Sequence, residues 1–299
     1  MHFDSSDMRL FVAVAQEKNL TRGAKKVHLS PAAASTRIKA FEDQLGAQLL
    51  YRDTKGVALT AAGVTLLHHA RLILRQAEHL ESEVSSLGGD SVGHVRIFAN
   101  TTAVTEFMPE ILARFMSNRP AVTVDLQERL TRDIIRGVRE GTADVGIVAG
   151  PVSADNLEIT HFSTDRLVLV AAKAHPVSGR DKVRFSDTLS FEHVGLHEGS
   201  TLHAFLTEIV QREGKCYPVR IQVRSFEAMC RMIEAGVGIG ILPESAARRH
   251  SKTMELAILE LDEPWAIRER SLLVRHLDGL PGCVRALVDD VVRFKSARS

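Results

Sequence analysis

The stretch KKVHLSPAAASTRIKAFEDQLG, residues 25–46, joins a helix-start signal to a run of small side chains. Ser30 suits an N-cap, and Pro31 suits the first helical position, where its missing N–H leaves no bond unmade. We therefore predict a helix from Pro31 to Leu45 that stops at Gly46. Alanines at the start of such a helix indicate close packing against another helix, or close approach of the backbone to a large partner.

A helical wheel divides this segment into two faces. The face predicted to be buried is apolar and has 4-3-4 spacing: Ala34, Ile38, Phe41 and Leu45. The opposite face is small, hydroxylated and basic: Ala32, Thr36 and Lys39, with Ala33 and Ser35 at its edges. A merely solvated face would usually carry acids as well, so the pattern favours exposure of this face to a partner.

The flanking residues predict the rest of a small domain. Apolar residues at helical spacing indicate a first helix over about 5–17: Met8, Phe11, Val12 and Ala15. We expect Thr21 to cap a short second helix, RGAKKV. After the third helix, LLYRDTKGVALT predicts a two-stranded wing around a Lys-Gly turn.

Basic residues concentrate in this region although the net charge of the chain is only +1. Between residues 18 and 41 there is no Asp or Glu, and the cations are Lys18, Arg22, Lys25, Lys26, Arg37 and Lys39. A solvated basic face is the alternative interpretation. A helix-turn-helix that offers the third helix to the DNA major groove explains both the charge and the small residues. The residues predicted to contact double-stranded DNA are Arg22, Pro31, Ala32, Ser35, Thr36, Lys39, Arg52 and Lys55.

A long helix follows the wing. Thr60 suits its cap, and a heptad seam steps along it: Leu66, Ala70, Ile73, Ala77, Leu80, Val84 and Leu87. The helix could lie on its own domain, but its polar flanks favour pairing with a second copy, as a homodimer or homotetramer. The segment GGDSVG, residues 88–93, is a glycine-rich domain boundary.

The remaining residues alternate between predicted strands and helices. The strands are HVRIFA, AVTVDL, DVGIVA, RLVLVA, HVGLH, VRIQV, VGIGIL and SLLVRH, and the helices are VTEFMPEILARFMS, RDIIRGVREG, LHAFLTEIVQREG and FEAMCRMIEAG. This order predicts βαβ units with largely parallel sheets. Hydroxyl-bearing residues follow three of the strands, at 100–102, at Thr131 and at 199–201. Each group is explained by N-capping alone, but three together favour a ligand cleft at the strand ends.

From about residue 5 to its end, the chain resembles the LysR-type transcriptional regulators. The resemblance rests on LTRGAKKVHLSPAAASTRIKAFEDQLGAQLLYRDTKGVALTAAG, on GTADVGIV, on LVLVAAKAHPV and on RSFEAMCRMIEAGVGIGILPES. One departure is that Pro31-Ala32 stand where the family commonly has Gln-Pro, so the target sequence cannot be carried over. Another is Thr36, where the family often has Arg.

The resemblance implies an α+β multidomain fold with a winged helix-turn-helix, a long linker helix and a two-subdomain α/β effector-binding domain like a periplasmic binding protein. The expected boundaries are 1–60 for DNA binding, 61–88 for the dimerisation helix, 89–93 for a hinge, 94–165 with 268–299 for subdomain I, and 166–267 for subdomain II. The chain would cross between subdomains near Arg166 and Arg268.

An effector is expected between the two subdomains. The positions implied are Asn100, Thr101, Thr102, Arg129, Thr131, Ser200, Thr201 and Phe226. Arg129 replaces a position usually occupied by Gly, which bears on the charge of the ligand. Hydroxyls at helix N-termini together with Arg129 predict a small organic anion.

Other function classes are disfavoured. The N-terminus lacks signal-peptide features and no apolar run approaches the ~18 residues of a membrane span, so we expect a cytoplasmic protein without a membrane partner. An enzyme on this fold would leave residues 5–60 without purpose, a transport binding protein would need a signal peptide, and a nonspecific nucleoid protein differs by its indifference to DNA sequence. We expect no catalytic site, no cofactor and no metal, and RNA polymerase as a further partner.

The spacing of histidines and cysteines supports this expectation. His193, His197 and His203 span a strand, a loop and a helix, which does not favour a zinc site. Cys216 and Cys230 could form a redox pair, as in the peroxide-sensing members of the family. Cys230 lies on an apolar helical face, however, which favours a buried structural cysteine.

Overall fold

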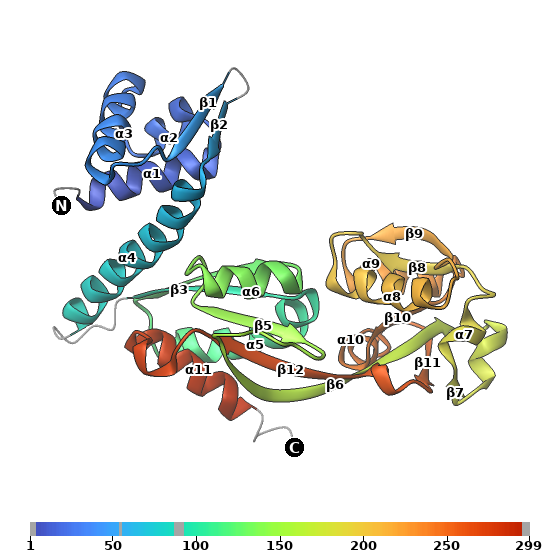
Figure 1. Cartoon of the computed structure of the whole chain (residues 1–299). Helices are drawn as coiled ribbons and strands as arrows, with labels where there is room; N and C mark the ends of the chain where they lie inside the picture. The colour runs from blue at the N-terminus through green and yellow to red at the C-terminus, as the bar shows by residue number, and fades with distance from the viewer. Residues whose placement is uncertain (1–3, 54–55, 87–92, 295–299) are drawn as a thin grey trace. The chain divides into compact units, whose positions relative to one another are not determined.

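A computed structural model describes residues 4–53, 56–86 and 93–294 of the chain (Figure 1). The chain divides into two units, which we treat separately. The first comprises Met1–Gly93 with Glu140–Thr142, and the second comprises His94–Arg139 with Ala143–Ser299. Leu87 and residues 89–92, predicted to end the heptad seam and to form the hinge, lie outside the described residues.

The first unit begins with a bundle of three helices: α1 (Ser5–Glu17), α2 (Leu20–Lys26) and α3 (Pro31–Leu45). Their apolar faces share one core, in which Phe11 meets Phe41 edge to face. Gly23 lets α2 approach α1 closely, because a Cβ there would lie 2.5 Å from the Val14 Cα. The cap of α2 corrects our prediction: the Asn19 side chain accepts from the Arg22 N–H, so α2 starts before Thr21 rather than after it.

The third helix confirms the prediction from its sequence. The Ser30 hydroxyl accepts from the Ala33 N–H at 3.2 Å, and Gly46 ends the helix with a left-handed φ of 63°. Of the predicted core face, Ala34, Ile38 and Phe41 are buried and Leu45 packs against the same core. The opposite face is left open to solvent.

The wing and the long helix complete the first unit. Strands β1 (Leu50–Asp53) and β2 (Gly56–Leu59) pair antiparallel, as predicted. The Thr60 hydroxyl accepts from the Gly63 N–H at 3.0 Å and so caps the start of α4 (Ala61–Ser86).

The second unit is built on one long sheet with the strand order β4-β3-β5-β12-β6-β11-β7, and β10 also pairs with β6. Its strands are β3 (Gly93–Ala99), β4 (Val122–Glu128), β5 (Val145–Ala149), β6 (Glu158–Ala172), β7 (Lys182–Val183), β10 (Gly240–Pro243), β11 (Leu256–Leu261) and β12 (Ile267–Val274). The strands β8 (His193–Leu196) and β9 (Val219–Val223) form a parallel pair, and His193 bridges to Ile239 just before β10.

Helices cover both faces of this sheet. They are the π-helix η1 (Ala103–Phe107), α5 (Met108–Ser117), α6 (Thr131–Arg139), α7 (Phe185–Thr188), α8 (Thr201–Arg212), α9 (Phe226–Glu234), α10 (Glu244–His250) and α11 (Gly282–Phe294). Single-turn 3-10 helices cover Pro176–Gly179, Pro264–Ala266 and Leu277–Gly279. α5 and α11 cover one face of the β3-side strands and α6 the other (Figure 1).

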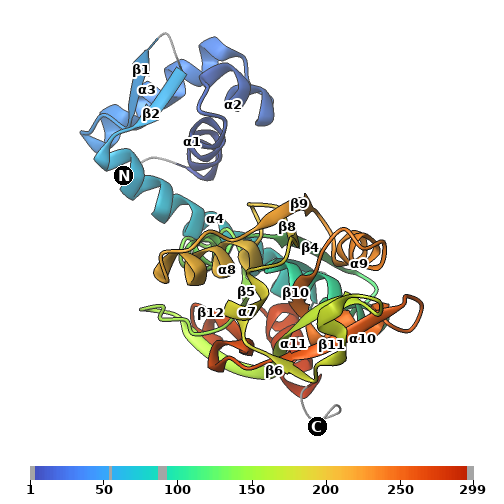
Figure 2. The same ribbon diagram turned by 90° about the vertical axis from the view of Figure 1, so that its right-hand side faces the viewer.

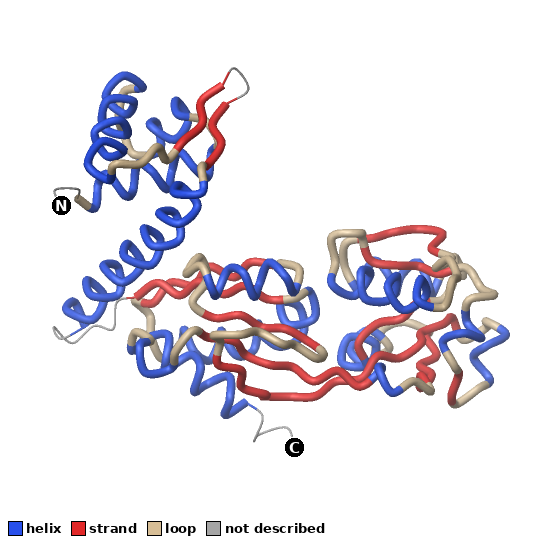
Figure 3. Tube along the Cα trace, in the orientation of Figure 1, coloured by secondary structure: helices blue, strands red, loops and turns tan. Residues whose placement is uncertain are grey.

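Two long antiparallel strands, β6 and β12, run through both halves of the second unit (Figure 3). Ile267 lies opposite Arg166 and Arg268 opposite Asp165, near the residues at which we placed the crossings. The prediction of largely parallel sheets is wrong for the centre, where β5–β12, β12–β6, β6–β11 and β6–β10 are all antiparallel. Two strands that each cross the junction once, in opposite directions, produce this pattern.

The apolar cores divide the second unit into two lobes. The first lobe packs residues between 95 and 162 with residues between 272 and 291, on both faces of its strands. The second lobe packs residues between 167 and 266. Figure 2 shows α8 and α9 on opposite sides of β8 and β10 in this second lobe.

Candidate functional site

A small cavity of about 30 Å³ lies at the junction of the two lobes. The first lobe contributes Asn100, Thr101, Thr102 and Ala149 from the ends of β3 and β5. The second lobe contributes Thr201, Leu202 and Pro243, and the crossing strands contribute Asp165, Arg166, Leu167, Arg268 and Arg270. The cavity therefore lies where both crossing strands pass between the lobes.

Arg270, on β12, is buried and contacts three neighbouring side chains. Its guanidinium forms an ion pair with Asp165, donates to the Ser163 hydroxyl at 3.0 Å, and lies 3.6 Å from the centre of the Phe107 ring. Burial lowers the pKa of Arg270 to about 10, against the opposing effect of Asp165. Asp165 in turn accepts from the Ser245 hydroxyl at 2.7 Å. These contacts neutralise Arg270 and assign it a structural role.

Arg268 lies two residues earlier on β12, on the same side of the strand, and differs in its partners. It donates to the Ala149 carbonyl at 2.9 Å and stacks 3.9 Å from the centre of the Phe205 ring. No ion pair joins it to a carboxylate in the part of the chain that the structure describes. Burial lowers the pKa of Arg268 to about 10, which still leaves it charged near neutral pH. Arg268 thus brings an uncompensated positive charge to the cavity wall.

Gly150 makes this position of Arg268 possible. Its φ of +89° is left-handed, and a Cβ at this residue would lie 2.8 Å from the Arg268 Cζ. A side chain there would therefore push the guanidinium away from the cavity wall and from the Ala149 carbonyl.

The small polar residues predicted at this site have different roles. Asn100 and Ser200 cap helices, because their side chains accept from the Ala103 and His203 N–H groups at 2.9 and 3.1 Å. Thr101 donates to Glu128 Oε1 at 2.6 Å. The Thr201 hydroxyl oxygen, by contrast, is buried and has no hydrogen-bond partner among the described residues. This oxygen is therefore available to hydrogen-bond a ligand or water at the cavity wall.

An open groove of about 610 Å³ adjoins the cavity and shares Ala149, Thr201 and Arg268 with it. Thr131 lines this groove rather than the cavity, together with Arg132 of α6 and Glu208 of α8. The groove gives Arg268 and Thr201 access to solvent between α6 of the first lobe and α8 of the second.

Three predicted effector residues line neither the cavity nor the groove: Arg129, Phe226 and Ser200, the cap of α8. Arg129 is exposed, lines neither the cavity nor the groove, and donates to Gln127 Oε1 at 2.6 Å, with its guanidinium over Phe98. Phe226 is 1% exposed because it starts α9 with its ring in the core of the second lobe.

Sequence reasoning missed Arg268 and Arg270 as cavity residues, although it placed a crossing near Arg268. The available signal was the segment IRERSLLV, in which alternate arginines precede an apolar strand end. Residues two apart on a strand point to one side, so both side chains face the junction of the lobes, where each has different partners.

The predicted DNA-contacting residues of α3 lie together on its open face. Pro31, Ala32, Thr36 and Lys39 are exposed and Ser35 is half-buried. Arg22 of α2 is also exposed, although it lies 3.5 Å from Glu17. The side chain of Arg52 and the whole of Lys55 lie outside what the structure describes.

Some basic side chains near α3 form ion pairs within the protein and are therefore less available to bind DNA phosphates. Arg37 forms ion pairs with Asp4 at 3.2 Å and Asp7 at 2.8 Å, and Lys26 forms one with Glu17 at 2.6 Å. The cluster of cations seen in the sequence is thus partly neutralised within the first unit. Lys39, by contrast, forms no ion pair among the described residues.

The predicted heptad seam of α4 divides into two parts. Ala70 is fully buried and Leu66 partly buried in the core of the first unit. Further along, Ile73, Leu80 and Val84 are at least half exposed, at 50%, 59% and 60%. The apolar surface open to a partner is therefore the later half of the seam.

Other polar clusters are explained by packing. His193 is buried, donates from Nε2 to the Thr188 carbonyl at 3.1 Å, and has its pKa lowered to about 4 by burial. Burial raises the pKa of the Cys230 thiol to about 12, which disfavours the reactive thiolate, and Cys216 is exposed. Among the described residues no group of three or more His, Cys, Asp or Glu could hold a metal ion.

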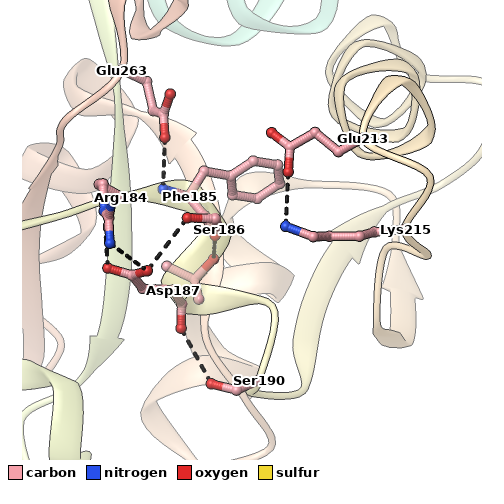
Figure 4. A network of polar contacts seen from close by, with 9 residues as sticks. Arg184, Phe185, Ser186, Asp187, Ser190, Glu213, Lys215 and Glu263 are labelled. Carbon is pink, nitrogen blue, oxygen red and sulfur yellow. Dashed lines mark hydrogen bonds and ion pairs between the residues drawn. The ribbon is translucent and has the colours of Figure 1, made fainter.

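The polar network in Figure 4 positions the short helix α7. Glu263 accepts from the Phe185 N–H at 2.9 Å, and Arg184 bonds across the first turn to Asp187. These groups are satisfied within the second lobe, so they do not suggest a ligand site. None of the helices in the described ranges has the length and apolar character needed to span a membrane.

Comparison with known proteins assigns a family to both parts of the chain. Residues 5–64 match the family model for the bacterial regulatory helix-turn-helix protein of the lysR family, and residues 88–294 match the model for the LysR substrate binding domain. A curated relative, "Probable RuBisCO transcriptional regulator" of Trieres chinensis, is 27% identical over 297 residues, covering 97% of this chain and 94% of the relative.

Solved structures show the same fold. The crystal structure of full-length CbnR with its target DNA has a TM-score of 0.64 at 23% identity and covers 97% of this chain and 99% of that one. Full-length OxyR from Pseudomonas aeruginosa has a TM-score of 0.70 at 21% identity and covers 97% and 98%. Because the two family models together span most of the chain, the protein belongs to the LysR family of bacterial helix-turn-helix transcriptional regulators.

Proposed function

We propose that this regulator binds specific DNA sequences through α3 and responds to a small organic anion held at the junction of the two lobes. The proposal of an effector site rests on two side chains that line the same cavity, Arg268 and Thr201. Arg268 has no carboxylate partner in the described residues, and the Thr201 hydroxyl has no hydrogen-bond partner there.

The chemistry of this wall favours an anion. A guanidinium offers several N–H donors in one plane, and Arg268 directs one to the Ala149 carbonyl, which leaves donors for a carboxylate or phosphate. Thr201 is the first residue of α8, a helix of 12 residues whose N-terminus adds a partial positive charge. Thr102 lies on the opposite side of the cavity and supplies a further hydroxyl.

The DNA-binding part rests on the open face of α3. Thr36 and Lys39 are exposed there; Thr36 would contact base edges, and Lys39 would contact phosphates. Pro31 and Ala32 let the backbone approach the groove, where apolar side chains can contact thymine methyl groups. Because the family's common Gln is absent here, shape and hydroxyl contacts would carry more of the readout.

We further propose that the later half of α4 joins two copies of the chain. The two DNA-binding units of the dimer would then contact two half-sites on the DNA. A regulator of this kind would act on transcription together with RNA polymerase. Effector binding would alter the relative position of the lobes and thereby the arrangement of the two DNA-binding units.

Calorimetric titration of the purified chain tests the effector site. The panel contains anions (inorganic phosphate, pyruvate, citrate and benzoate) and two controls, neutral glucose and cationic putrescine. We expect at least one anion to bind, and Arg268→Gln to weaken its binding by about tenfold or more, the factor corresponding to a lost charge-assisted hydrogen bond.

Arg129→Gln is the matched control, because Arg129 is the cation that sequence reasoning favoured and it lies outside the cavity lining. It should leave anion binding unchanged. Binding of only the neutral or cationic compounds, undisturbed by Thr102→Ala, would refute an anionic effector at this site.

A further inference from the structure

An ion pair joins the two lobes beside the cavity. The Glu106 carboxylate accepts two hydrogen bonds from Arg249, from Nε at 3.0 Å and from a terminal nitrogen at 2.7 Å. Glu106 lies on η1 of the first lobe and its side chain is 4% exposed, whereas Arg249 lies on α10 of the second lobe. A bidentate contact of this kind fixes both the distance and the relative orientation of its two supports.

The neighbouring residue of η1 reaches the second lobe by another route. Phe107 stacks on Arg270, Arg270 pairs with Asp165, and Asp165 accepts from Ser245 at the start of α10. Adjacent residues of η1 therefore connect to the two ends of α10. This double connection holds η1 and α10 in one arrangement.

The π-helix η1 also continues directly from the cavity wall. Asn100, Thr101 and Thr102 line the cavity, and Ala103 begins η1. Any displacement of η1 relative to α10 therefore changes the spacing between the cavity walls. π-helical turns recur at functional sites in proteins.

The cavity in this arrangement is too small for an organic effector. Its volume of about 30 Å³ leaves room for little more than water. Ligand pockets for small molecules commonly measure about 300–1,000 Å³. The adjoining groove gives a ligand access to Arg268 and Thr201, but a ligand that also enters the cavity lined by Thr102 needs the lobes to move apart.

We propose that the Glu106–Arg249 pair is a latch that stabilises the narrow form of the effector cavity and opposes ligand entry. This inference rests on the proposed effector site. The latch sets the ratio of narrow to wide forms, and a ligand that binds only the wide form must overcome it. Removal of the latch therefore widens the cavity in the absence of ligand and tightens ligand binding.

The distance across the groove measures this ratio without any ligand. Arg132 and Glu208 line opposite walls of the groove and are exposed, at 82% and 60%. Cysteines at these positions, in a chain with Cys216→Ser and Cys283→Ser, carry spin labels for electron–electron double resonance. Labelled chains are diluted with unlabelled chains so that each measured pair lies within one chain.

We expect Arg249→Gln and Glu106→Gln each to shift the distance distribution toward longer values, with about a tenfold change in the ratio of the two populations. Arg248→Gln is the matched control. Arg248 is the preceding residue of α10, but its Nε donates to Glu244 of the same helix at 2.7 Å. A distribution that stays unchanged in Arg249→Gln, or that shifts equally in Arg248→Gln, would overturn the latch.

Inorganic phosphate serves as the anion probe for the second half of the proposal. In calorimetry on unlabelled chains, Arg249→Gln should bind phosphate up to about tenfold more tightly than the wild type or Arg248→Gln. Equal affinities despite a wider distribution would refute control of the site by the latch. If the distance across the groove increased in Arg249→Gln but the chain bound no anion, the result would support the latch and count against the anionic effector.

Discussion

At the scale of single residues, burial and partners decide which charges can act. Arg268 and Arg270 occupy neighbouring positions on one side of β12, yet Asp165 neutralises only Arg270. The same reasoning separates Thr201, whose hydroxyl lacks a partner in the described structure, from Ser200, whose hydroxyl caps α8. Residue type alone does not distinguish the members of either pair.

This limits what the sequence can predict about the site. The junctions at residues 100–102 and 199–201 were found from the sequence, because hydroxyls after strands are a local signal. Arg268 as a cavity-lining cation was not found, because its neighbours Phe205 and Ala149 are distant in the chain. Arg129 was chosen instead because it is close in sequence to Thr131, but its side chain turns toward Gln127.

His193 provides a prediction at this scale. Burial lowers its pKa to about 4, below the ordinary value of 6.5 that it regains on unfolding. Between these pH values the unfolded chain binds more protons than the folded one, so stability falls as the pH drops through this window. The loss from pH 7 to pH 5 is about 2 kcal/mol from this residue.

His193→Gln keeps a hydrogen-bond donor for the Thr188 carbonyl and removes the titrating group. It should therefore reduce the loss of unfolding free energy between pH 7 and pH 5 by about 2 kcal/mol. Urea unfolding followed by the fluorescence of Trp265, which packs against Phe185 beside His193, measures the effect. His161→Gln, at an exposed position of β6, is the control. If the unfolding free energy changed with pH equally in His193→Gln and the wild type, the lowered pKa of buried His193 would be contradicted.

At the scale of elements, local signals predicted the first unit well. Ser30, Pro31 and Gly46 define the bounds of α3, and its core face follows from periodicity. In the second unit β11 and the helices α10 and α11 were missed. β11 lies between β6 and the edge strand β7, and these neighbours, not the sequence of β11, define its place.

The helix α4 carries a prediction at the element scale. Val84 and Val64 are the same residue type with similar exposure, 60% and 57%, but they lie on nearly opposite faces of the helix. If the later half of the seam joins two chains, Val84→Glu buries a charge in the interface and should raise the dimer dissociation constant by tenfold or more.

Val64→Glu should leave self-association unchanged, since Val64 lies away from the face shared by Ile73 and Leu80. Sedimentation velocity over a concentration series measures both variants. If both substitutions weakened self-association equally, or if neither weakened it, this face of α4 would not be the interface.

At the scale of the whole molecule, two functions are encoded in units that fold around separate cores. The first unit offers an exposed helix face that is small and basic, and the second contains a cavity between lobes with an uncompensated arginine. The family resemblance seen in the sequence already implied this division. Family membership identifies neither the ligand nor the DNA sequence, and at Pro31 and Thr36 of α3 the chain departs from the residues common in the family.

Recognition of DNA sequence by α3 can be measured by selecting bound duplexes from a randomised pool with the purified full chain. We predict a strongly enriched motif made of two half-sites, a changed motif for Thr36→Ala, and an unchanged motif with weaker, less salt-dependent binding for Lys39→Ala. No enrichment over the starting pool, or the same uniform weakening by both substitutions, would contradict the account.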